Sequence, residues 1–187
     1  MSNAIVPGSL SAIAQQNNCS LSESFLSCDA LVLLDMSGSM ESCDTPSGES
    51  RRKVATDQLI RLQKDNAGKL ALICFADSVV FCPAGFPQDC GGSTRLERAL
   101  EYIKPADDCG MKIIIISDGS PNSPEQCLNV ARTFKNKVDT IYIGPEGDYE
   151  GGRKFLEKLA SVTGGQALKS DAPGLLSKEV ETLLLKG

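Results

Sequence analysis

The hydrophobic and polar positions of this chain fall into blocks that predict strands and helices in alternation. Unbroken apolar runs at 30–34 and 113–116 are typical of strands buried on both faces of a parallel sheet. Strands are predicted at 30–35, 69–75, 79–82, 112–117, 139–143 and 166–169. Helices are predicted at about 50–65, 94–104, 124–136, 152–162 and 173–185.

The order of these elements predicts an α/β fold. Strands that alternate with helices favour an open, mostly parallel sheet covered on both faces. The connection between the strands at 69–75 and 79–82 is too short for a crossover, so these two strands must form an antiparallel hairpin at the sheet edge. We therefore expect a doubly wound, six-stranded sheet with one antiparallel edge strand and helices on both faces.

Several helices carry an apolar stripe that should face the sheet. The stripes comprise Val54, Ala55, Leu59 and Leu62, then Cys127, Val130, Ala131 and Phe134, and finally Leu176, Val180, Leu183 and Leu184. Pro105 should end the second helix, and Pro124 suits the first turn of the third. The first 18 residues are small and polar, so we expect a flexible arm there. The predicted division is an N-terminal arm at 1–27 and one domain at 28–187.

The charges and the apolar runs of the chain indicate which partners and which cellular location to expect. The formal net charge is −5, and residues 1–50 contain six acids but no Lys or Arg. No extended basic face follows from this pattern, which disfavours nucleic-acid binding. The short basic cluster at 51–53 is interpreted as a solvated helix start, with a local docking patch as the alternative. No apolar stretch approaches the roughly 20 residues of a membrane span, and no secretory signal is evident. We therefore expect a cytoplasmic protein.

The eight cysteines do not form a recognisable metal motif. None lies in a C-x-x-C pair, which disfavours a zinc knuckle. Without an export signal, we expect reduced thiols. Cys28 and Cys109 each precede a central strand and should lie at the same end of the sheet. Cys74 and Cys127 lie on apolar faces and are predicted to fill the core.

The strongest chemical signal is the run Asp-Met-Ser-Gly-Ser at 35–39, directly after the first strand. An acid and two hydroxyls at alternate positions present three oxygens to one point, and hard divalent cations prefer oxygen ligands. The alternative is a simple strand-to-helix turn in which Asp35 or Ser39 caps a helix.

Two further segments add oxygens at the same edge of the sheet. Thr94 follows two glycines at the start of a predicted helix, where it could alternatively serve as an N-cap. Asp118 follows the second apolar strand, and open α/β sheets place their sites at such carboxyl ends. Its alternative is an ordinary Asp-Gly turn.

Together these motifs resemble the von Willebrand factor A family and its metal-ion-dependent adhesion site. The family pattern is D-x-S-x-S, a distant Thr and a distant Asp, and this chain places Asp35, Ser37, Ser39, Thr94 and Asp118 there. The resemblance runs from about residue 30 to the C-terminus. It implies that these five residues hold Mg2+, with Mn2+ or Ca2+ as alternatives, and that an open position captures a Glu or Asp of a partner protein. The segment 40–50 is long for this place and should form a flap beside the metal.

The resemblance also implies a cellular role. Small stand-alone members occur in bacteria and often work beside AAA+ ATPases, kinases or phosphatases. We therefore expect a metal-dependent protein-binding module and no enzyme. A scaffold with a purely structural metal is the first alternative. The second alternative is a Mg2+-dependent phosphoryl-transfer enzyme with Asp35 as nucleophile. Against it, such phosphatases have an acid where this chain has Ser37, and the chain contains no His for acid–base catalysis.

Overall fold

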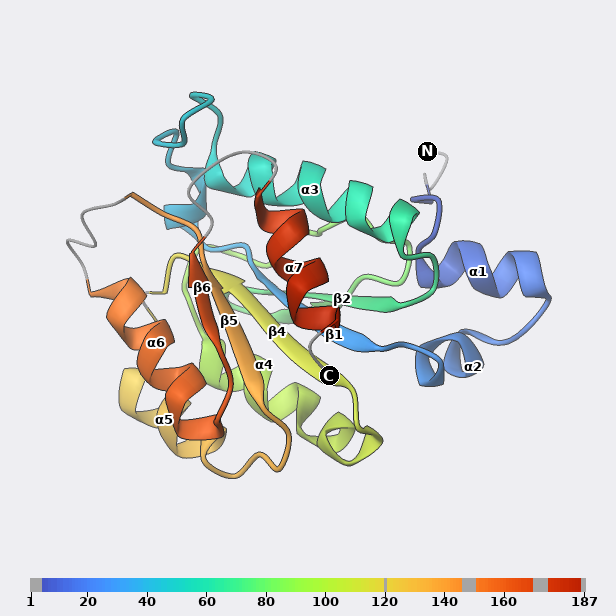
Figure 1. Ribbon diagram of the computed structural model, residues 1–187. Helices are drawn as coiled ribbons and strands as arrows, with labels where there is room; N and C mark the ends of the chain where they lie inside the picture. The colour runs from blue at the N-terminus through green and yellow to red at the C-terminus, as the bar shows by residue number, and fades with distance from the viewer. Residues whose placement is uncertain (1–4, 120, 146–150, 170–174, 186–187) are drawn as a thin grey trace.

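A six-stranded sheet forms the centre of the computed structural model, which describes residues 5–119, 121–145, 151–169 and 175–185 (Figure 1). The strand order is β3-β2-β1-β4-β5-β6. Every neighbouring pair is parallel except β2 and β3, which are antiparallel. The strands are β1 (Ala30–Asp35), β2 (Leu70–Phe75), β3 (Val79–Phe81), β4 (Lys112–Ser117), β5 (Val138–Tyr142) and β6 (Ala167–Lys169). The predicted fold class is confirmed.

The central strand β1 marks the point where the order of the sheet reverses. It pairs with β2 on one side, where Asp35 lies opposite Phe75, and with β4 on the other, where Leu34 lies opposite Ile116. All six residues of β1 are buried, as the continuous apolar run predicted. In doubly wound sheets the loops at such a reversal diverge and leave a crevice at the carboxyl ends of the strands.

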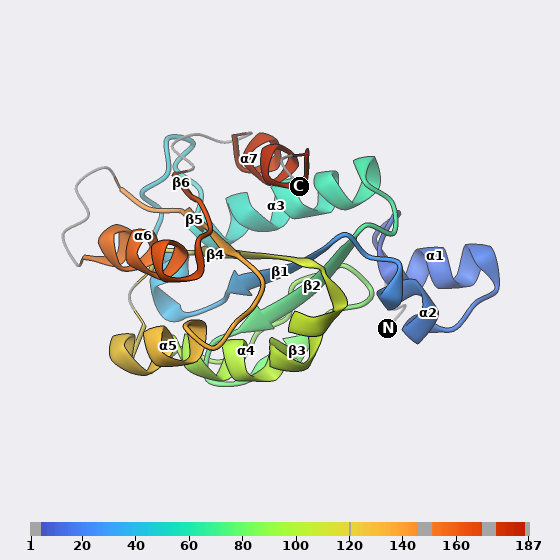
Figure 2. The ribbon, with the colours of Figure 1, turned by 60° about the horizontal axis from the view of Figure 1, so that its bottom comes forward.

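Helices cover both faces of the sheet (Figure 2). On one face lie α3 (Arg51–Asp65) and α7 (Leu175–Leu185), whose buried side chains join one hydrophobic cluster. On the other lie α4 (Leu96–Ile103), α5 (Pro124–Ala131) and α6 (Gly152–Thr163), which join a second cluster. The short 3-10 helices are η1 (Gly38–Glu41) and η2 (Lys104–Cys109).

Element boundaries follow the predictions closely, with two differences. The helix expected to start at residue 94 begins at Leu96, and its N-cap Arg95 makes no side-chain cap hydrogen bond. The helix expected at 124–136 ends at Ala131, although Pro124 does occupy its first turn. The start expected at 173 for the last helix lies outside the described residues.

The N-terminal segment differs from the expected flexible arm because it is helical. Helices α1 (Leu10–Asn17) and α2 (Leu21–Leu26) begin at the caps Ser9 and Ser20, and Ser20 forms a capping box with Glu23. Leu10 is buried in the core. The backbone N–H of Val6 also donates to Ala84 O across 2.9 Å, which ties the segment to the loop after β3.

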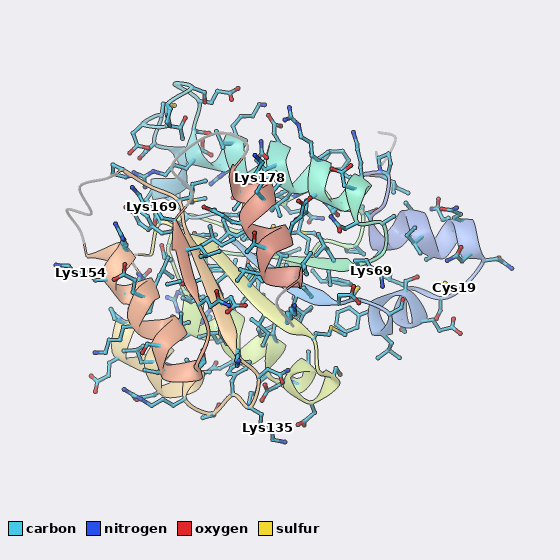
Figure 3. The ribbon with its side chains drawn as sticks, in the orientation of Figure 1. Cys19, Lys69, Lys135, Lys154, Lys169 and Lys178 are labelled. Carbon is cyan, nitrogen blue, oxygen red and sulfur yellow. The ribbon has the colours of Figure 1, made fainter. Side chains whose placement is uncertain are left out.

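Figure 3 shows Lys69, Lys135, Lys154 and Lys178 in separate parts of the fold. Among the described residues, no helix is long and apolar enough to cross a membrane. All eight cysteines are free thiols, and Cys74 and Cys127 are fully buried as predicted.

Candidate metal centre

The end of β1 places a carboxylate at the centre of the sheet edge. Asp35 is the last residue of the strand and is fully buried. Its Oδ1 accepts a hydrogen bond from the backbone N–H of Ser37 at 2.8 Å, and its Oδ2 accepts one from the hydroxyl of Ser117 at 2.6 Å. Both oxygens therefore have fixed directions.

The turn after β1 brings two hydroxyls together. The Oγ atoms of Ser37 and Ser39 lie 3.1 Å apart, which is close enough for one hydroxyl to donate to the other. Ser37 precedes η1 without a side-chain cap hydrogen bond, and Ser39 lies inside η1 and not at its N-cap. The turn is held by the Met36 N–H, which donates to Phe75 O at 2.9 Å.

The loop that carries Thr94 lies directly against this turn. The N–H of Gly38 donates to Gly92 O at 3.0 Å, and the N–H of Gly92 donates to Asp77 Oδ2 at 2.8 Å. A Cβ atom at Gly91 would lie 2.2 Å from Asp77 Oδ2, so glycine is needed for this close approach. Thr94 itself is largely buried, with 7% of its surface exposed.

The loop after β4 completes the group. Asn122 accepts at Oδ1 from the Thr94 N–H at 2.7 Å, and its own N–H donates to Thr94 O at 2.9 Å. These two bonds join the loop after Asp118 to the loop of Thr94. The hydrogen bond between Ser117 and Asp35 joins it to β1. The structure thus links the loops that carry all five predicted site residues.

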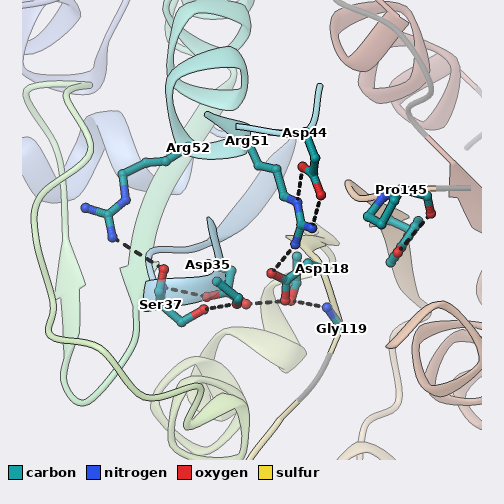
Figure 4. A network of polar contacts seen from close by, with 11 residues as sticks. Asp35, Ser37, Asp44, Arg51, Arg52, Asp118, Gly119 and Pro145 are labelled. Atoms are coloured by element: carbon teal, nitrogen blue, oxygen red, sulfur yellow. Dashed lines mark hydrogen bonds and ion pairs between the residues drawn. The ribbon is translucent and has the colours of Figure 1, made fainter. Parts of the chain in front are cut away.

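Asp118 has one paired and one unpaired oxygen. Its Oδ2 accepts from Nη1 of Arg51 at 2.8 Å (Figure 4). Its Oδ1 is buried and has no hydrogen-bond partner among the described residues. A buried carboxylate oxygen without a partner is costly, and native proteins seldom keep one without a ligand or a functional reason.

The surroundings also perturb the acidity of Asp35. Burial raises the pKa of Asp35 to about 6, since the charged form loses its water. Hydrogen bonds from Ser117 and Ser37 act in the opposite direction, and the nearby charge of Asp118 raises the pKa further.

Two arginines near the site were misjudged from the sequence. Arg51 and Arg52 were expected at a solvated helix start, yet only 9% of Arg51 is exposed and its guanidinium bridges Asp44 and Asp118. Arg52 donates to Met36 O at 2.5 Å and pairs with Glu41 at 2.6 Å. These contacts bring the segment 40–50 beside the site, where a flap was predicted.

The residues fit a hard divalent cation, although no strong acidic cluster is present. Within the described ranges, no group of three or more His, Cys, Asp or Glu side chains is placed to hold a metal ion. The candidate donors are instead three hydroxyls and two carboxylates, which suit Mg2+, Mn2+ or Ca2+. The unpaired Oδ1 of Asp118 is the observation that supports this fit.

Comparisons with known proteins bear on the fold. No protein-family description matches the chain, and no curated protein sequence does. A von Willebrand factor type A structure from Catenulispora acidiphila matches with a TM-score of 0.66 and 18% identity, covering 84% of this chain and 42% of that chain. The chain has a fold like that of von Willebrand factor A domains.

Other solved structures share this von Willebrand factor A fold. BatB from Bacteroides thetaiotaomicron matches with a TM-score of 0.58 and 17% identity, over 86% of this chain and 100% of that chain. The manganese-loaded TRAP protein of Plasmodium vivax matches with a TM-score of 0.56 and 18% identity, over 86% of this chain and 73% of that chain. At such identities the likeness concerns the fold alone.

Proposed function

We propose that this chain is a protein-interaction module that binds a partner carboxylate through a divalent cation. Asp35, Ser37, Ser39, Thr94 and Asp118 would hold the cation, with Mg2+ as the first candidate. The bound cation would supply an electrophilic centre for a Glu or Asp side chain of the partner. The observation that carries the proposal is the buried Oδ1 of Asp118, which has no partner among the described residues, together with the linked hydroxyls of Ser37 and Ser39.

The donor set explains why a partner carboxylate would bind. Hydroxyl ligands carry no charge, so only Asp35 and Asp118 offset the charge of the cation. A cation with few anionic ligands attracts a further carboxylate strongly. One structural neighbour, the TRAP protein, is described as manganese-loaded, which supports a divalent ion at a fold of this kind.

Catalysis is the less favoured function. A nucleophilic Asp35 would have to contact a substrate phosphoryl group directly, yet its side chain is fully buried. The chain also contains no His to serve as a general base. These observations favour a binding module over a phosphoryl-transfer enzyme.

Binding of Mn2+ tests the proposal directly. Isothermal titration of the purified protein should give one site per chain, and Asp118→Ala should abolish it. Asp29→Ala is the matched control, because Asp29 is exposed and pairs with Lys69 at the surface. Equal Mn2+ affinity in the wild type and the Asp118 variant would contradict the site.

A partner capture experiment separates a binding site from a structural metal. Proteins retained by the immobilised chain in Mg2+ should be released by EDTA, and Thr94→Ala should reduce their retention more than it lowers the melting temperature. Retention that is unchanged in EDTA would favour the scaffold with a structural ion. Which protein binds, and whether an AAA+ ATPase, kinase or phosphatase is among the partners, follows from the same capture.

A further inference from the structure

A buried arginine contacts one of the proposed cation ligands. Nη1 of Arg51 lies 2.8 Å from Oδ2 of Asp118, and the two side chains are 10% and 4% exposed. Arg51 comes from the first turn of α3, whereas Asp118 follows β4. A pair as buried as this one interacts far more strongly than an ion pair at the surface.

The guanidinium is held from its other side by the segment 42–50. Nε of Arg51 donates to Asp44 Oδ1 at 2.8 Å, and Nη2 donates to Asp44 Oδ2 at 2.5 Å. The backbone N–H of Arg51 also donates to Ser42 O at 3.2 Å. This two-point contact fixes the plane of the guanidinium and points Nη1 at Asp118 (Figure 4). The side chain of Asp44 is 36% exposed, so water screens its charge more than that of Asp118.

We infer that Arg51 is a positioning residue that sets the charge of the proposed cation site and thereby its preference for a carboxylate, an inference that rests on the proposed function. By holding Oδ2, Arg51 leaves Oδ1 of Asp118 as the oxygen available to the site. Its positive charge also opposes a second cation nearby, which lowers the affinity for the divalent ion.

The charges of the nearest groups show why this favours an incoming carboxylate. Ionised Asp35, Asp44 and Asp118 together with Arg51 leave two net negative charges, which a divalent cation neutralises. An incoming carboxylate then meets a site without net charge. Without Arg51 the loaded site would keep one net negative charge, which would repel a partner carboxylate.

Replacing Arg51 with a neutral residue should therefore raise the affinity for Mn2+ and lower the affinity of the Mn2+-loaded site for a carboxylate. Arg51→Gln retains a donor for Asp118 but removes the charge, so we expect Mn2+ to bind at least tenfold more tightly in a titration. Acetate serves as the carboxylate probe. Acetate displaces water from protein-bound Mn2+, and water-proton relaxation measures this displacement. The same displacement should require at least tenfold more acetate in Arg51→Gln than in the wild type. Arg51→Met, which keeps the apolar stem, provides a second neutral variant if Arg51→Gln fails to fold.

Two controls separate charge from structure. Arg51→Lys keeps the charge and should keep Mn2+ affinity within about threefold of the wild type. Lys53→Gln removes a cation from the same helical turn, but its side chain is 54% exposed and pairs with Glu49 and Asp57, so neither measurement should change.

Each other outcome has a definite meaning. If the neutral Arg51 variants bind Mn2+ equally or more weakly, Arg51 has only a structural role and the inference is overturned, while the metal site stands. The inference is also overturned, and the metal site stands, if the neutral variants bind Mn2+ more tightly but their acetate response is unchanged. If the wild type binds no Mn2+, the proposed function fails and the inference fails with it.

Discussion

The hydroxyl of Ser117 donates to Oδ2 of Asp35 across 2.6 Å, although 82 residues separate them in the chain. This bond joins the carboxyl ends of β1 and β4 at the point where the sheet order reverses. The same Oγ accepts from the N–H of Gly119 at 2.8 Å, which also fixes the start of the loop after Asp118. One serine that was assigned no role from the sequence therefore orients the carboxylate of Asp35 and fixes the backbone next to Asp118.

Removing this hydroxyl should destabilise the protein. Ser117→Ala leaves a buried carboxylate oxygen of Asp35 without its donor, which costs about 1–3 kcal/mol of unfolding free energy. Urea denaturation measures the change. Ser22→Ala is the control, because Ser22 is exposed on α2 and its replacement should change stability by less than about 0.5 kcal/mol. Equal effects of the two variants would show that the bond contributes nothing.

Divalent cations should raise the melting temperature. A ligand that binds only the folded state stabilises it by about 2.7 kcal/mol at a hundredfold excess over Kd. We expect this response to Mg2+ or Mn2+ in the wild type and its loss in Asp35→Asn and Asp118→Ala. Differential scanning fluorimetry with and without EDTA gives the measurement. A shift that persists in both variants would place the cation elsewhere.

The raised pKa of Asp35 gives a pH dependence in the presence of EDTA. Because the folded protein holds this proton more tightly, with a pKa of about 6 against an ordinary 3.8, the stabilising contribution is present at low pH and is lost as the pH rises through 6. Asp35→Asn stays neutral throughout. The unfolding free energy of the wild type relative to this variant should therefore fall by roughly 2 kcal/mol between pH 4 and pH 8. A flat difference would mean that the carboxyl is not perturbed.

Two glycines provide a matched pair for backbone packing beside the site. Gly119 and Gly110 both have positive φ, at +82° and +71°. An added Cβ at Gly119 would lie 2.2 Å from the backbone oxygen of Gly152 at the start of α6, whereas one at Gly110 meets nothing within 4 Å. Gly110→Ala should cost only about 1 kcal/mol of backbone strain. Gly119→Ala should cost clearly more in the same denaturation series, and equal costs would contradict the close approach.

Alkylation should divide the eight thiols by exposure. Cys43 and Cys109 are exposed and should react with iodoacetamide first. Burial raises the pKa of Cys28 to about 11 and that of Cys127 to about 12, so both should react only after unfolding. Mass spectrometry of peptides taken over time gives the order. Fast labelling of Cys127 in the native protein would show that α5 opens readily.

The sheet was predictable because its strands depend on local apolar runs, and because strands that alternate with helices favour a mostly parallel sheet. The strand order itself was not predicted. The N-terminal helices were missed because α1 has only one fully buried residue, Leu10, and so lacks a clear apolar stripe. The start of α2 could nevertheless have been predicted, since Ser20 and Glu23 have the spacing of a capping box.

Some residues of the candidate site could also be predicted from the sequence, and others could not. Asp35, Ser37, Ser39, Thr94 and Asp118 follow from motifs at strand ends, and the structure links the loops that carry them. Whether they bind a metal stays a prediction. The contact between Arg51 and Asp118 joins residues 67 positions apart, and nothing in either local sequence indicates it. Such pairings depend on how α3 is packed on the sheet, which no local pattern specifies.

The two outermost strands, β3 and β6, have three residues each, against five or six in the inner strands. A neighbouring chain that tried to extend this sheet would find few free backbone groups to pair with, and short edges of this kind protect proteins from edge-to-edge aggregation. We therefore expect the domain to stay dispersed at high concentration and to leave association to its loops, which can change in sequence without disturbing the strands.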